Sequence, residues 1–323
     1  MNLSDIIEPI HAELDRFDDY FREAIRSKVA FVDMITRYVV RRKGKRIRPS
    51  LVLLTAKACG EINEKSYRGA ALVEILHTAT LIHDDVIDDS NTRRGFPSIN
   101  AVWKNKIAVL MGDFMLAKGL LLSLDNDDFK FLKIISDSVR RMSEAEILQT
   151  AKSRQLNMDE ETYLKIISDK TASLISTCCQ IGATSVTDDR DMLQRVKIFG
   201  DNIGMVFQIR DDVLDYTGRR SITGKPTGLD MKEKKLTLPL IHALAKAPGS
   251  HGKAILRIIK NGAGRKDLQR VVDFANEYGG IEYATKKGEY YSTLAREAIT
   301  PFPDSPAKES LTSVIDFFLT RSK

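Results

Sequence analysis

The 323-residue chain has no proline between Pro97 and Pro226, although it contains nine prolines in all. Proline breaks helix interiors because it lacks a backbone N–H and its ring clashes with the preceding turn, so this gap favours long helices. Few segments alternate strictly between apolar and polar residues, and no Asn-Gly joins two strand-like runs. Apolar residues in the gap instead recur at spacings of three and four, as on one face of a helix; they include Phe131, Ile134, Ile135, Val139, Met142, Ile147, Leu164, Ile167, Leu174 and Ile175. We therefore expect an all-α fold with many helices.

No segment marks a domain boundary, and we expect residues 1–323 to form a single domain. Hydrophobic residues make up 43% of the chain and charged residues 29%, which suffices for one large core. Residues 218–239 form a long polar stretch, and loops of this length in compact domains are often functional lids. The turn-rich segment PFPDSPAKES, residues 301–310, is expected to precede a short last helix.

Composition excludes several classes of protein. No run of 18 uncharged apolar residues is present, so we expect no transmembrane helix, and the N-terminus has no apolar core of a signal peptide. The three cysteines, Cys59, Cys178 and Cys179, lack metal-ligand spacing and are expected to be reduced core thiols of a cytoplasmic protein. A net charge of +6 is compatible with an anionic ligand and does not require nucleic acid.

Two segments share an aspartate-rich pattern, IHDDVID at residues 82–88 and IRDDVLD at residues 209–215. On an ideal helix the three aspartates of each segment fall at about 0°, 40° and 100°, so that their carboxylates point into one sector. Like charges four residues apart repel, and uncompensated charge next to such apolar sequence is costly. A cation is the simplest compensation, and Mg²⁺ binds through one or two carboxylates while waters and substrate phosphates complete its shell. The two sets are Asp84, Asp85 and Asp88, and Asp211, Asp212 and Asp215.

Other residues fall on the same helical faces. His77 lies about two turns before Asp84 on one stripe, and Gln208 lies about 60° from Asp211, within the carboxylate sector. Gly204 also falls in that sector, where a glycine would let a substrate tail pass close to the backbone. The alternatives are a solvated acidic face, an N-terminal helical turn favoured by the macrodipole and, for His77, a core histidine. The repetition of the pattern after apolar sequence argues against a solvated face, and neither segment has the spacing of an EF-hand.

Three groups of basic residues are candidates for binding phosphate. The first, RRKGKRIRP at residues 41–49, runs into an apolar helical segment, and a basic loop at a helix N-terminus is a ready anion site. Such a run also suits a nucleic-acid patch. The second group directly follows the first aspartate cluster, and arginine grips phosphate in a bidentate manner. The second and third groups are Arg93 and Arg94, and Lys170 and Thr171 with Lys225 and Lys235. Together with the carboxylates, these groups suit a diphosphate bridged by magnesium ions.

From Gly44 to Leu240 the sequence resembles the trans-isoprenyl diphosphate synthase (polyprenyl synthetase) family, and within it the medium- or long-chain polyprenyl diphosphate synthases. The family often has Gly-Lys where this chain has Lys234 and Lys235, and the spacing to the following Thr-Leu-Pro selects Lys235. The resemblance implies an all-α bundle around a deep central cavity, usually a homodimer. The motifs that carry it are GKRIRP, HTATLIHDDVIDDSNTRRG, KTASLI, GMVFQIRDDVLDYTG and GKPTGLDMKEKKLTLPLI.

The resemblance also implies a role for each site residue. The residues that would hold about three Mg²⁺ ions are Asp84, Asp85, Asp88, Asp211, Asp212 and Asp215. Those that would bind the allylic diphosphate are Arg93, Lys170, Thr171, Gln208, Lys225 and Lys235. Those that would bind isopentenyl diphosphate are Lys45, Arg48, His77 and Arg94. The residues expected to carry catalysis are Asp84, Asp85, Asp88, Lys170, Thr171, Gln208, Asp211 and Lys225.

The implied reaction is head-to-tail chain elongation, in which an allylic carbon–oxygen bond breaks and the isopentenyl double bond attacks the cation. Positive charge around the departing pyrophosphate stabilises it, and closure of the 218–239 loop would exclude water. Ala79 and Thr80, upstream of Asp84, are small, whereas short-chain members of the family often carry aromatic residues there. We therefore expect a pocket that continues towards a floor near Ile135 and a product longer than C15.

Four alternatives remain open at this level. A short-chain farnesyl or geranylgeranyl diphosphate synthase would carry out the same reaction. A class I terpene cyclase shares the first aspartate motif, but its second metal site usually has another composition. A non-catalytic partner subunit of a heteromeric synthase would be expected to lack some of the six aspartates. A helical protein that only binds metal or nucleic acid is the fourth alternative.

Overall fold

The structure is a computed structural model that describes residues 2–40, 44–93, 95–217, 231, 233–262 and 264–321. Nearly all regular structure in these ranges is helical, which confirms the expected all-α class. The helices of the first half are α1 (Leu3–Ile7), the 3₁₀ helix η1 (Glu8–Ile10), α2 (His11–Ala24), α3 (Ala30–Val40), α4 (Ile47–Cys59), α5 (Glu64–Ile87), α6 (Ile99–Leu124) and α7 (Phe129–Gln155).

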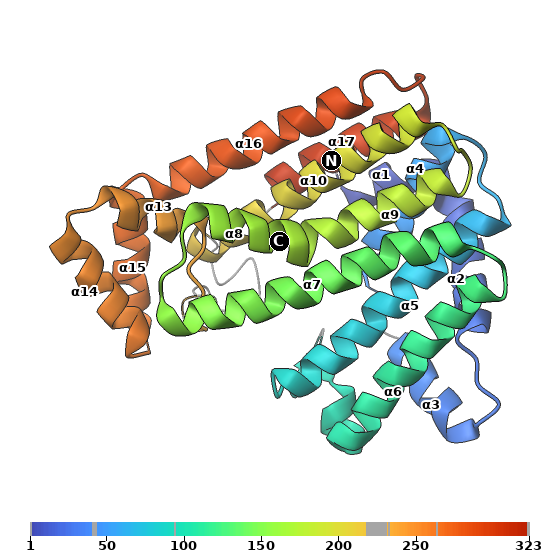
Figure 1. Cartoon of the computed structure of the whole chain (residues 1–323), viewed down its shortest axis with the longest axis horizontal. Helices are drawn as coiled ribbons and strands as arrows, with labels where there is room; N and C mark the ends of the chain where they lie inside the picture. Colours follow the sequence, from blue (N-terminus) through green and yellow to red (C-terminus); the bar gives the residue numbers. More distant parts are fainter. Residues whose placement is uncertain are drawn as a thin grey trace.

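The second half continues in the same manner and ends in a bundle of shorter helices. Its elements are α8 (Glu160–Ile167), the π-helix η2 (Ser168–Ala172), α9 (Ser173–Thr184), α10 (Arg190–Thr217), α13 (Leu238–Lys246), α14 (Gly249–Lys260), α15 (Arg265–Glu277), α16 (Gly280–Ile299) and α17 (Pro306–Thr320). Figure 1 shows α7, α9, α10 and α16 along the molecule, with α13, α14 and α15 gathered at one end.

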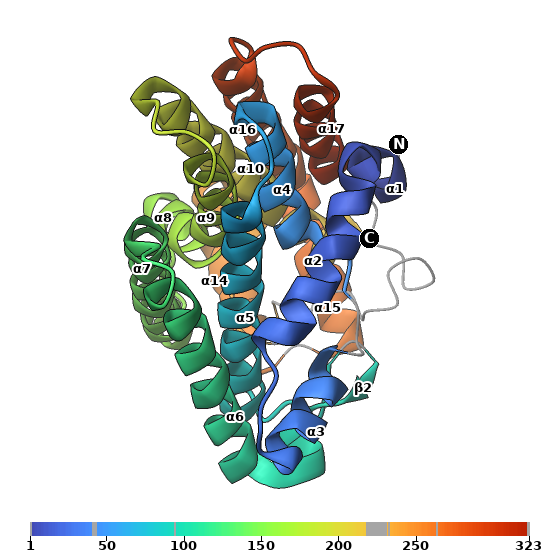
Figure 2. The ribbon, with the colours of Figure 1, turned by 90° about the vertical axis from the view of Figure 1, so that its right-hand side faces the viewer.

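The long helix α5 runs through the middle of the molecule. Figure 2 shows it surrounded by neighbours, and α2, α4, α6 and α9 all pack against it. Asn63 caps its N-terminus by accepting hydrogen bonds from the backbone N–H groups of Lys65 and Ser66. Apolar residues cover most of its circumference, as in other helices that are buried on all sides. Helix α5 therefore carries the first aspartate cluster from the core to one end of the bundle.

Buried apolar residues form two clusters, and α10 contributes to both. Phe199 and Val206 of α10 belong to the larger cluster, which is built mainly from α1–α7, α9 and α17. Met205 and Ile209 belong to the second cluster, which includes residues of α8 and α13–α16. The C-terminal part of α10, with the second aspartate cluster, therefore lies where the two groups of helices meet.

Two elements differ from the expectation, a short hairpin and the last helix. Residues 92–93 and 96–97 form a minimal antiparallel hairpin of strands β1 (Thr92–Arg93) and β2 (Phe96–Pro97), which the absence of an Asn-Gly signal did not predict. Gly95 supplies the positive φ of 80° that its tight turn requires. The last helix is longer than expected, because Ser305 caps it and Pro306 occupies its first turn, where proline is tolerated.

Helix α6 leaves a wide apolar face uncovered. Its exposed residues include Val109, Leu110, Leu116, Leu120, Leu121 and Leu124. Among the residues that the structure describes, α6 alone is long and apolar enough by composition to cross a membrane. Of its most apolar stretch of 18 residues, 33% is buried inside the protein. Asp113 and Lys118 interrupt this apolar sequence. A core helix can pass the same test, so the composition of α6 by itself assigns no membrane.

Candidate active site

The first aspartate cluster lies at the C-terminal end of α5. Asp84 and Asp85 belong to its last turn, whereas Asp88 is the C-cap and not an interior helical residue as the ideal-helix projection assumed. The backbone N–H of Asp88 still donates to the carbonyl of Asp84 at 2.8 Å, so the turn is kept. A helix C-terminus is the negative end of the macrodipole, and the last turn of α5 has no basic residue. The N-terminal alternative for this cluster is therefore wrong.

The second cluster occupies the equivalent end of α10. Asp211, Asp212 and Asp215 fall in its last two turns, and the last turn again has no basic residue. Carboxylates at the negative end of a helix are disfavoured unless a positive charge compensates them. A bound cation would therefore stabilise both clusters, because each places carboxylates at the negative C-terminal end of a helix.

The hairpin β1–β2 places Arg93 against the first cluster. The guanidinium donates to Oδ1 of Asp85 from Nε and from Nη2, both at 2.7 Å. Asp85 is buried, with 5% of its surface exposed. Asp84 is less fully compensated. Burial raises the pKa of Asp84, the Glu146 and Asp88 carboxylates raise it further, and Arg93 and Lys170 only partly offset the increase.

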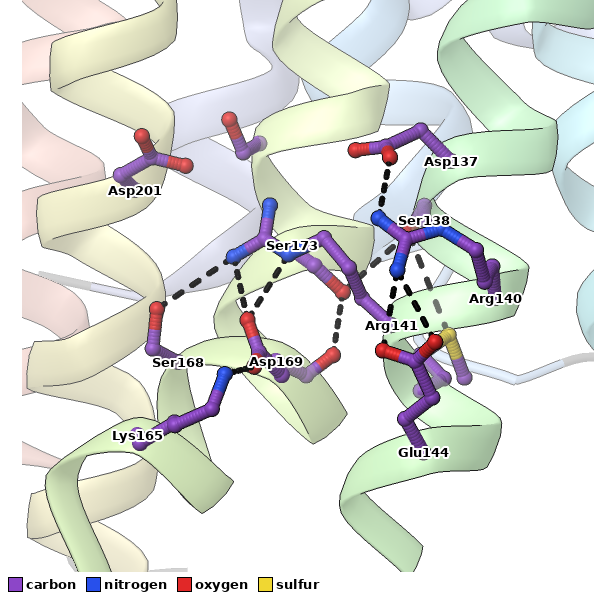
Figure 3. Close-up of polar contacts among 12 residues, drawn as sticks. Asp137, Ser138, Arg140, Arg141, Glu144, Lys165, Ser168, Asp169, Ser173 and Asp201 are labelled. Carbon is purple, nitrogen blue, oxygen red and sulfur yellow. Dashed lines mark hydrogen bonds and ion pairs between the residues drawn. The ribbon is translucent and has the colours of Figure 1, made fainter. Parts of the chain in front are cut away.

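Lys170 and Thr171 lie on η2, a π-helical turn that the sequence pattern did not predict. Such turns inside longer helices often occur at functional sites. Figure 3 shows how η2 is tied to its neighbours: Asp169 accepts from Arg141 of α7 at 2.8 Å and from Lys165 of α8 at 2.7 Å. Burial raises the pKa of Asp169, but the hydrogen bonds from Lys165 and Arg141 outweigh burial and lower it overall.

Lys170 connects η2 with the first cluster. Its Nζ lies 2.5 Å from Oε2 of Glu146 and donates to Oε1 of Gln149 at 2.7 Å, both on α7. Its positive charge also lowers the pKa of Asp84, so the ammonium group acts on the end of α5. Glu146 and Gln149 were not predicted, because nothing in the spacing of α7 distinguishes them from other polar surface residues.

A chain of hydrogen bonds connects η2 with the second cluster. The Thr171 hydroxyl donates to Oε1 of Gln208 at 2.8 Å, and Nε2 of Gln208 donates to Oδ1 of Asp212 at 2.7 Å. Oδ2 of Asp212 accepts from the Tyr163 hydroxyl at 2.6 Å. The expected place of Gln208 beside the carboxylates is therefore confirmed. Thr171 of η2 is thus linked to the second aspartate cluster through Gln208, and Lys170 of η2 lowers the pKa of Asp84 in the first.

Gly204 has a different role from the expected one. A Cβ at Gly204 would lie 2.4 Å from Cα of Ala172, so the glycine faces η2 and not a substrate channel. Gly200, one turn earlier, approaches Ser176 of α9 in the same way. These two glycines let α10 pack directly against the backbone of η2 and α9. The close approach brings Gln208 within reach of Thr171.

Asp211 is paired with a residue from the end of the chain. Oδ1 of Asp211 lies 2.5 Å from Nη2 of Arg321, which directly follows α17. The Arg321 guanidinium also stacks over the Phe207 ring at 3.8 Å and donates to the Phe207 carbonyl at 3.0 Å. Arg321 is 114 residues from Phe207 in sequence, and no motif pointed to it.

The first basic group borders a pocket beside α5. Arg46 is the N-cap of α4 in a left-handed conformation, and its Nη2 lies 2.5 Å from Oδ2 of Asp18. Arg46 and Asp18 line the pocket together with Glu74, Asp85 and Arg93. Of the predicted residues, Lys45 is exposed, Arg48 is partly buried in the first turn of α4, and His77 is buried on α5.

The remaining predicted residues are placed as follows. Lys235 lies 2.5 Å from Glu233 and lines a second pocket with Lys170, Thr171, Gln208 and Asp212. Ala79 and Ile135 are buried, and Thr80 is partly buried. Arg94, Lys225 and most of the expected lid, residues 218–230 and 232, lie outside the described residues, as do residues 41–43.

Residues 29–275 match the family described as polyprenyl synthetase. The chain belongs to this polyprenyl synthetase family. It is 37% identical over 318 residues to an all-trans-nonaprenyl-diphosphate synthase (geranyl-diphosphate specific) of Rhodobacter capsulatus, covering 98% of this chain and 97% of that protein. The fold is similar to that of a decaprenyl diphosphate synthase from the same organism, with a TM-score of 0.92, 32% identity and complete coverage of both chains.

A solved polyprenyl synthase from Caulobacter crescentus CB15, complexed with calcium and isoprenyl diphosphate, has a TM-score of 0.90 at 31% identity. It covers 100% of this chain, and this chain covers 98% of it. Membership confirms the resemblance found in the motifs, and the protein is a prenyltransferase that makes prenyl diphosphates.

The carboxylates of this polyprenyl synthetase fit a divalent cation that is shared with substrate. Within the described ranges, no three His, Cys, Asp or Glu side chains converge closely enough to hold a metal ion by themselves. Mg²⁺ commonly keeps waters and takes further ligands from phosphates, so separated carboxylates at two helix ends suit it. Burial and then the neighbouring carboxylates raise the pKa of Asp84, so a cation beside it would stabilise its ionised form.

Proposed function

We propose that this enzyme joins isopentenyl diphosphate head-to-tail to an allylic diphosphate, with release of pyrophosphate, and that its product is longer than C15. One observation carries the proposal: Lys170 and Thr171 on η2 connect the two aspartate-bearing helix ends through charge and hydrogen bonds. A diphosphate held beside η2 would meet carboxylates on both sides and cationic donors between them.

The reaction requires the allylic carbon–oxygen bond to break, which leaves negative charge on pyrophosphate. Mg²⁺, about three ions held by the aspartates and the diphosphate, would supply compensating positive charge and polarise the leaving group. Lys170, Arg93 and Lys235 add fixed positive charge, and Gln208 adds a neutral donor. Lys225 remains part of the proposal although it lies outside the described residues. No protein nucleophile is needed, because the isopentenyl double bond attacks the allylic carbon. The resulting cation then loses a proton to the departing pyrophosphate, which restores a double bond.

The pocket beside α5 is the proposed site for isopentenyl diphosphate. Arg46, Arg93 and Pro49 line it at the N-terminal end of α4, where backbone N–H groups also favour an anion. Lys45, Arg48 and His77 remain the proposed ligands, with Arg94 beyond the described residues. In this arrangement Arg93 stands between the two diphosphates, since it also pairs with Asp85.

Helices α5 and α7 support a long product. Lys170 pairs with Glu146 of α7, and its charge lowers the pKa of Asp84 at the C-terminal end of α5. Nearer the N-terminus of α5, a Cβ added at Gly69 would lie 3.2 Å from the ring of Phe131 on α7. These two points on α5 are fifteen residues apart, about 22 Å at helical rise, and both lie near α7. We propose that the growing chain passes Ala79 and Thr80 of α5 and extends towards Phe131 and Ile135 of α7.

The exposed apolar face of α6 is the proposed dimer surface. Burial of apolar area is the main driving force of obligate association, and an exposed patch of this extent marks an interaction site. A second copy would cover the face without placing Asp113 and Lys118 in lipid. We therefore propose a cytoplasmic homodimer without stable membrane insertion.

The activity test uses labelled isopentenyl diphosphate with geranyl or farnesyl diphosphate, with and without Mg²⁺, followed by mass spectrometry of the products. We expect polyprenyl diphosphates longer than C15, and Asp84→Ala should reduce activity by at least about a hundredfold, because charge compensation of the leaving group is lost. Asp137→Ala, which removes an exposed ion pair on α7, is the control. A cyclised hydrocarbon, or full activity of Asp84→Ala, would contradict the proposal.

A further inference from the structure

We propose that Tyr163 and Asp212 are a positioning pair that fixes the amide of Gln208 towards the allylic diphosphate, and that Asp212 is not itself a metal ligand. The inference rests on the proposed function and refines it, because it separates Asp212 from the other aspartates of its cluster. It starts from the bond between the Tyr163 hydroxyl of α8 and Oδ2 of Asp212, at 2.6 Å.

The pair is more deeply buried than the rest of its cluster. Tyr163 and Asp212 each expose 3% of their surface, whereas the Asp211 side chain is 48% exposed. A buried carboxylate is costly unless hydrogen bonds satisfy it. Oδ2 of Asp212 accepts from Tyr163, and Oδ1 accepts from Gln208. Tyr163 belongs to α8 and Gln208 to α10, so this carboxylate holds two elements together.

The direction of these bonds fixes the amide of Gln208. A carboxylate accepts hydrogen bonds, so the nitrogen of the amide must face Asp212 and its oxygen must face the other way. That oxygen accepts from the Thr171 hydroxyl at 2.8 Å, which commits the hydroxyl proton of Thr171. The second N–H of Gln208 then remains as a donor, and Gln208 lines the pocket that also contains Lys170 and Lys235.

The chain of bonds thus assigns different tasks to neighbouring residues. Gln208 donates to the diphosphate, Thr171 orients Gln208, and Tyr163 orients Asp212. Tyr163 and Asp212 line the same pocket as Gln208 and Lys170. Removing the Tyr163 hydroxyl would let the Asp212 carboxylate rotate and would loosen the Gln208 amide, while the side chains of Gln208 and Lys170 would remain. Residues that contact a binding side chain, and not the ligand itself, normally hold that side chain in place.

The test compares Tyr163→Phe, Asp212→Asn and the double variant by calorimetric binding of inorganic pyrophosphate in the presence of Mg²⁺. The loss of one positioning hydrogen bond should weaken pyrophosphate binding by about three- to tenfold. Asp212→Asn should weaken it at least as much, because its amide nitrogen allows the Gln208 amide to flip. The double variant should be no worse than Asp212→Asn, since both changes act on one chain of contacts. The KM for isopentenyl diphosphate should not change.

Two further measurements keep the inference separate from a loss of folding or of the proposed function. Tyr283→Phe is the matched control, because it removes another tyrosine bond to a carboxylate, that of Glu160 at 2.7 Å, the first residue of α8. Binding of Mn²⁺ at saturating pyrophosphate, followed by electron paramagnetic resonance, should weaken in Asp211→Asn and not in Asp212→Asn.

The inference is overturned if Tyr163→Phe binds pyrophosphate as the parent does, or if Asp212→Asn loses Mn²⁺ as Asp211→Asn does. Additive effects in the double variant would also overturn it. If the unchanged enzyme binds pyrophosphate but forms no labelled prenyl product, the proposed function fails instead. If Tyr163→Phe does not fold, Asp212→Asn alone still decides between positioning and metal binding.

Discussion

Asp169 illustrates how a residue outside the substrate pockets can set the geometry of the site. It precedes Lys170 and Thr171 on η2 and holds two cations, Arg141 and Lys165, from different helices. Figure 3 shows both donors converging on its carboxylate. Because the pKa of Asp169 is lowered in the folded protein, its contribution to stability is present above its unfolded pKa of about 3.9 and is lost as the pH falls.

Replacing Asp169 with asparagine should lower the free energy of unfolding at pH 7 by about 1.5–3 kcal/mol, because charge-assisted hydrogen bonds are lost. The difference from the parent should shrink as the pH falls below about 3.9, first because the unfolded chain binds a proton there and then because the folded carboxyl, with its lowered pKa, is protonated as well. Urea denaturation at several pH values measures both effects. Asp137→Asn, in an exposed pair with Arg140, should change stability by less than about 0.5 kcal/mol. A difference that is constant down to pH 3 would contradict this account.

Ala79 tests the proposed product pocket. Leu76 and His83, three residues before and four after Ala79, contact Gly119 and Gly112 of α6, so Ala79 lies near the side of α5 that faces α6. A phenyl ring here should block the path of the growing chain, and Ala79→Phe should shift the products to shorter chains at a stability cost of about 1–3 kcal/mol. Mass spectrometry of the products is the measurement, with Ala79→Ser as the control of similar size. An unchanged product distribution would exclude this path.

At the scale of elements, the packing of α10 against η2 is decisive. Gly204 has no room for a Cβ, because the nearest atom is Cα of Ala172 at 2.4 Å. The helical projection placed Gly204 on the same side of α10 as Gln208, but it did not predict that Ala172 of η2 would lie against this glycine. The π-helical turn itself depends on long-range contacts, and its hydrogen-bond pattern has no local signature comparable to proline or a capping residue.

Gly204→Ala should therefore destabilise the protein by about 1–3 kcal/mol and weaken pyrophosphate binding, because α10 must move away from η2. Thermal denaturation and calorimetry measure the two effects together. Gly249→Ala is the control: its Cβ would meet no atom within 4 Å, and alanine is the better helix former. Equal stability of the two variants would show that the close contact is not required.

At the scale of the whole molecule, the uncovered face of α6 should determine assembly. Leu121, with 51% of its surface exposed, belongs to this face. Leu121→Glu should shift the protein from dimer to monomer at micromolar concentration, because a charge would be buried in an apolar contact. Light scattering with size-exclusion chromatography measures the mass. Ile147→Glu changes a more exposed apolar residue of α7, at 72%, and should leave the mass unchanged. A Leu121→Glu protein of dimeric mass would exclude this surface.

Periodicity, proline placement and the two aspartate motifs are properties of contiguous sequence, and they sufficed for the all-α class and the family, whereas the roles of the candidate site residues stay predictions. Helical period placed Gln208 beside the carboxylates because both lie on one helix, four residues apart. The same projection misplaced Asp88, because helix ends depend on where packing stops and not on period alone.

The tertiary structure decided which residues meet across elements. Tyr163 reaches Asp212 across 49 residues and Arg321 reaches Phe207 across 114, and no local pattern encodes such partners. The tertiary structure also decided that both aspartate clusters lie at the negative C-terminal ends of helices, where a cation would stabilise them. The physical reason is that hydrogen bonds and hydrophobic burial act over ångströms in space, whereas the sequence records only the order in which the partners occur.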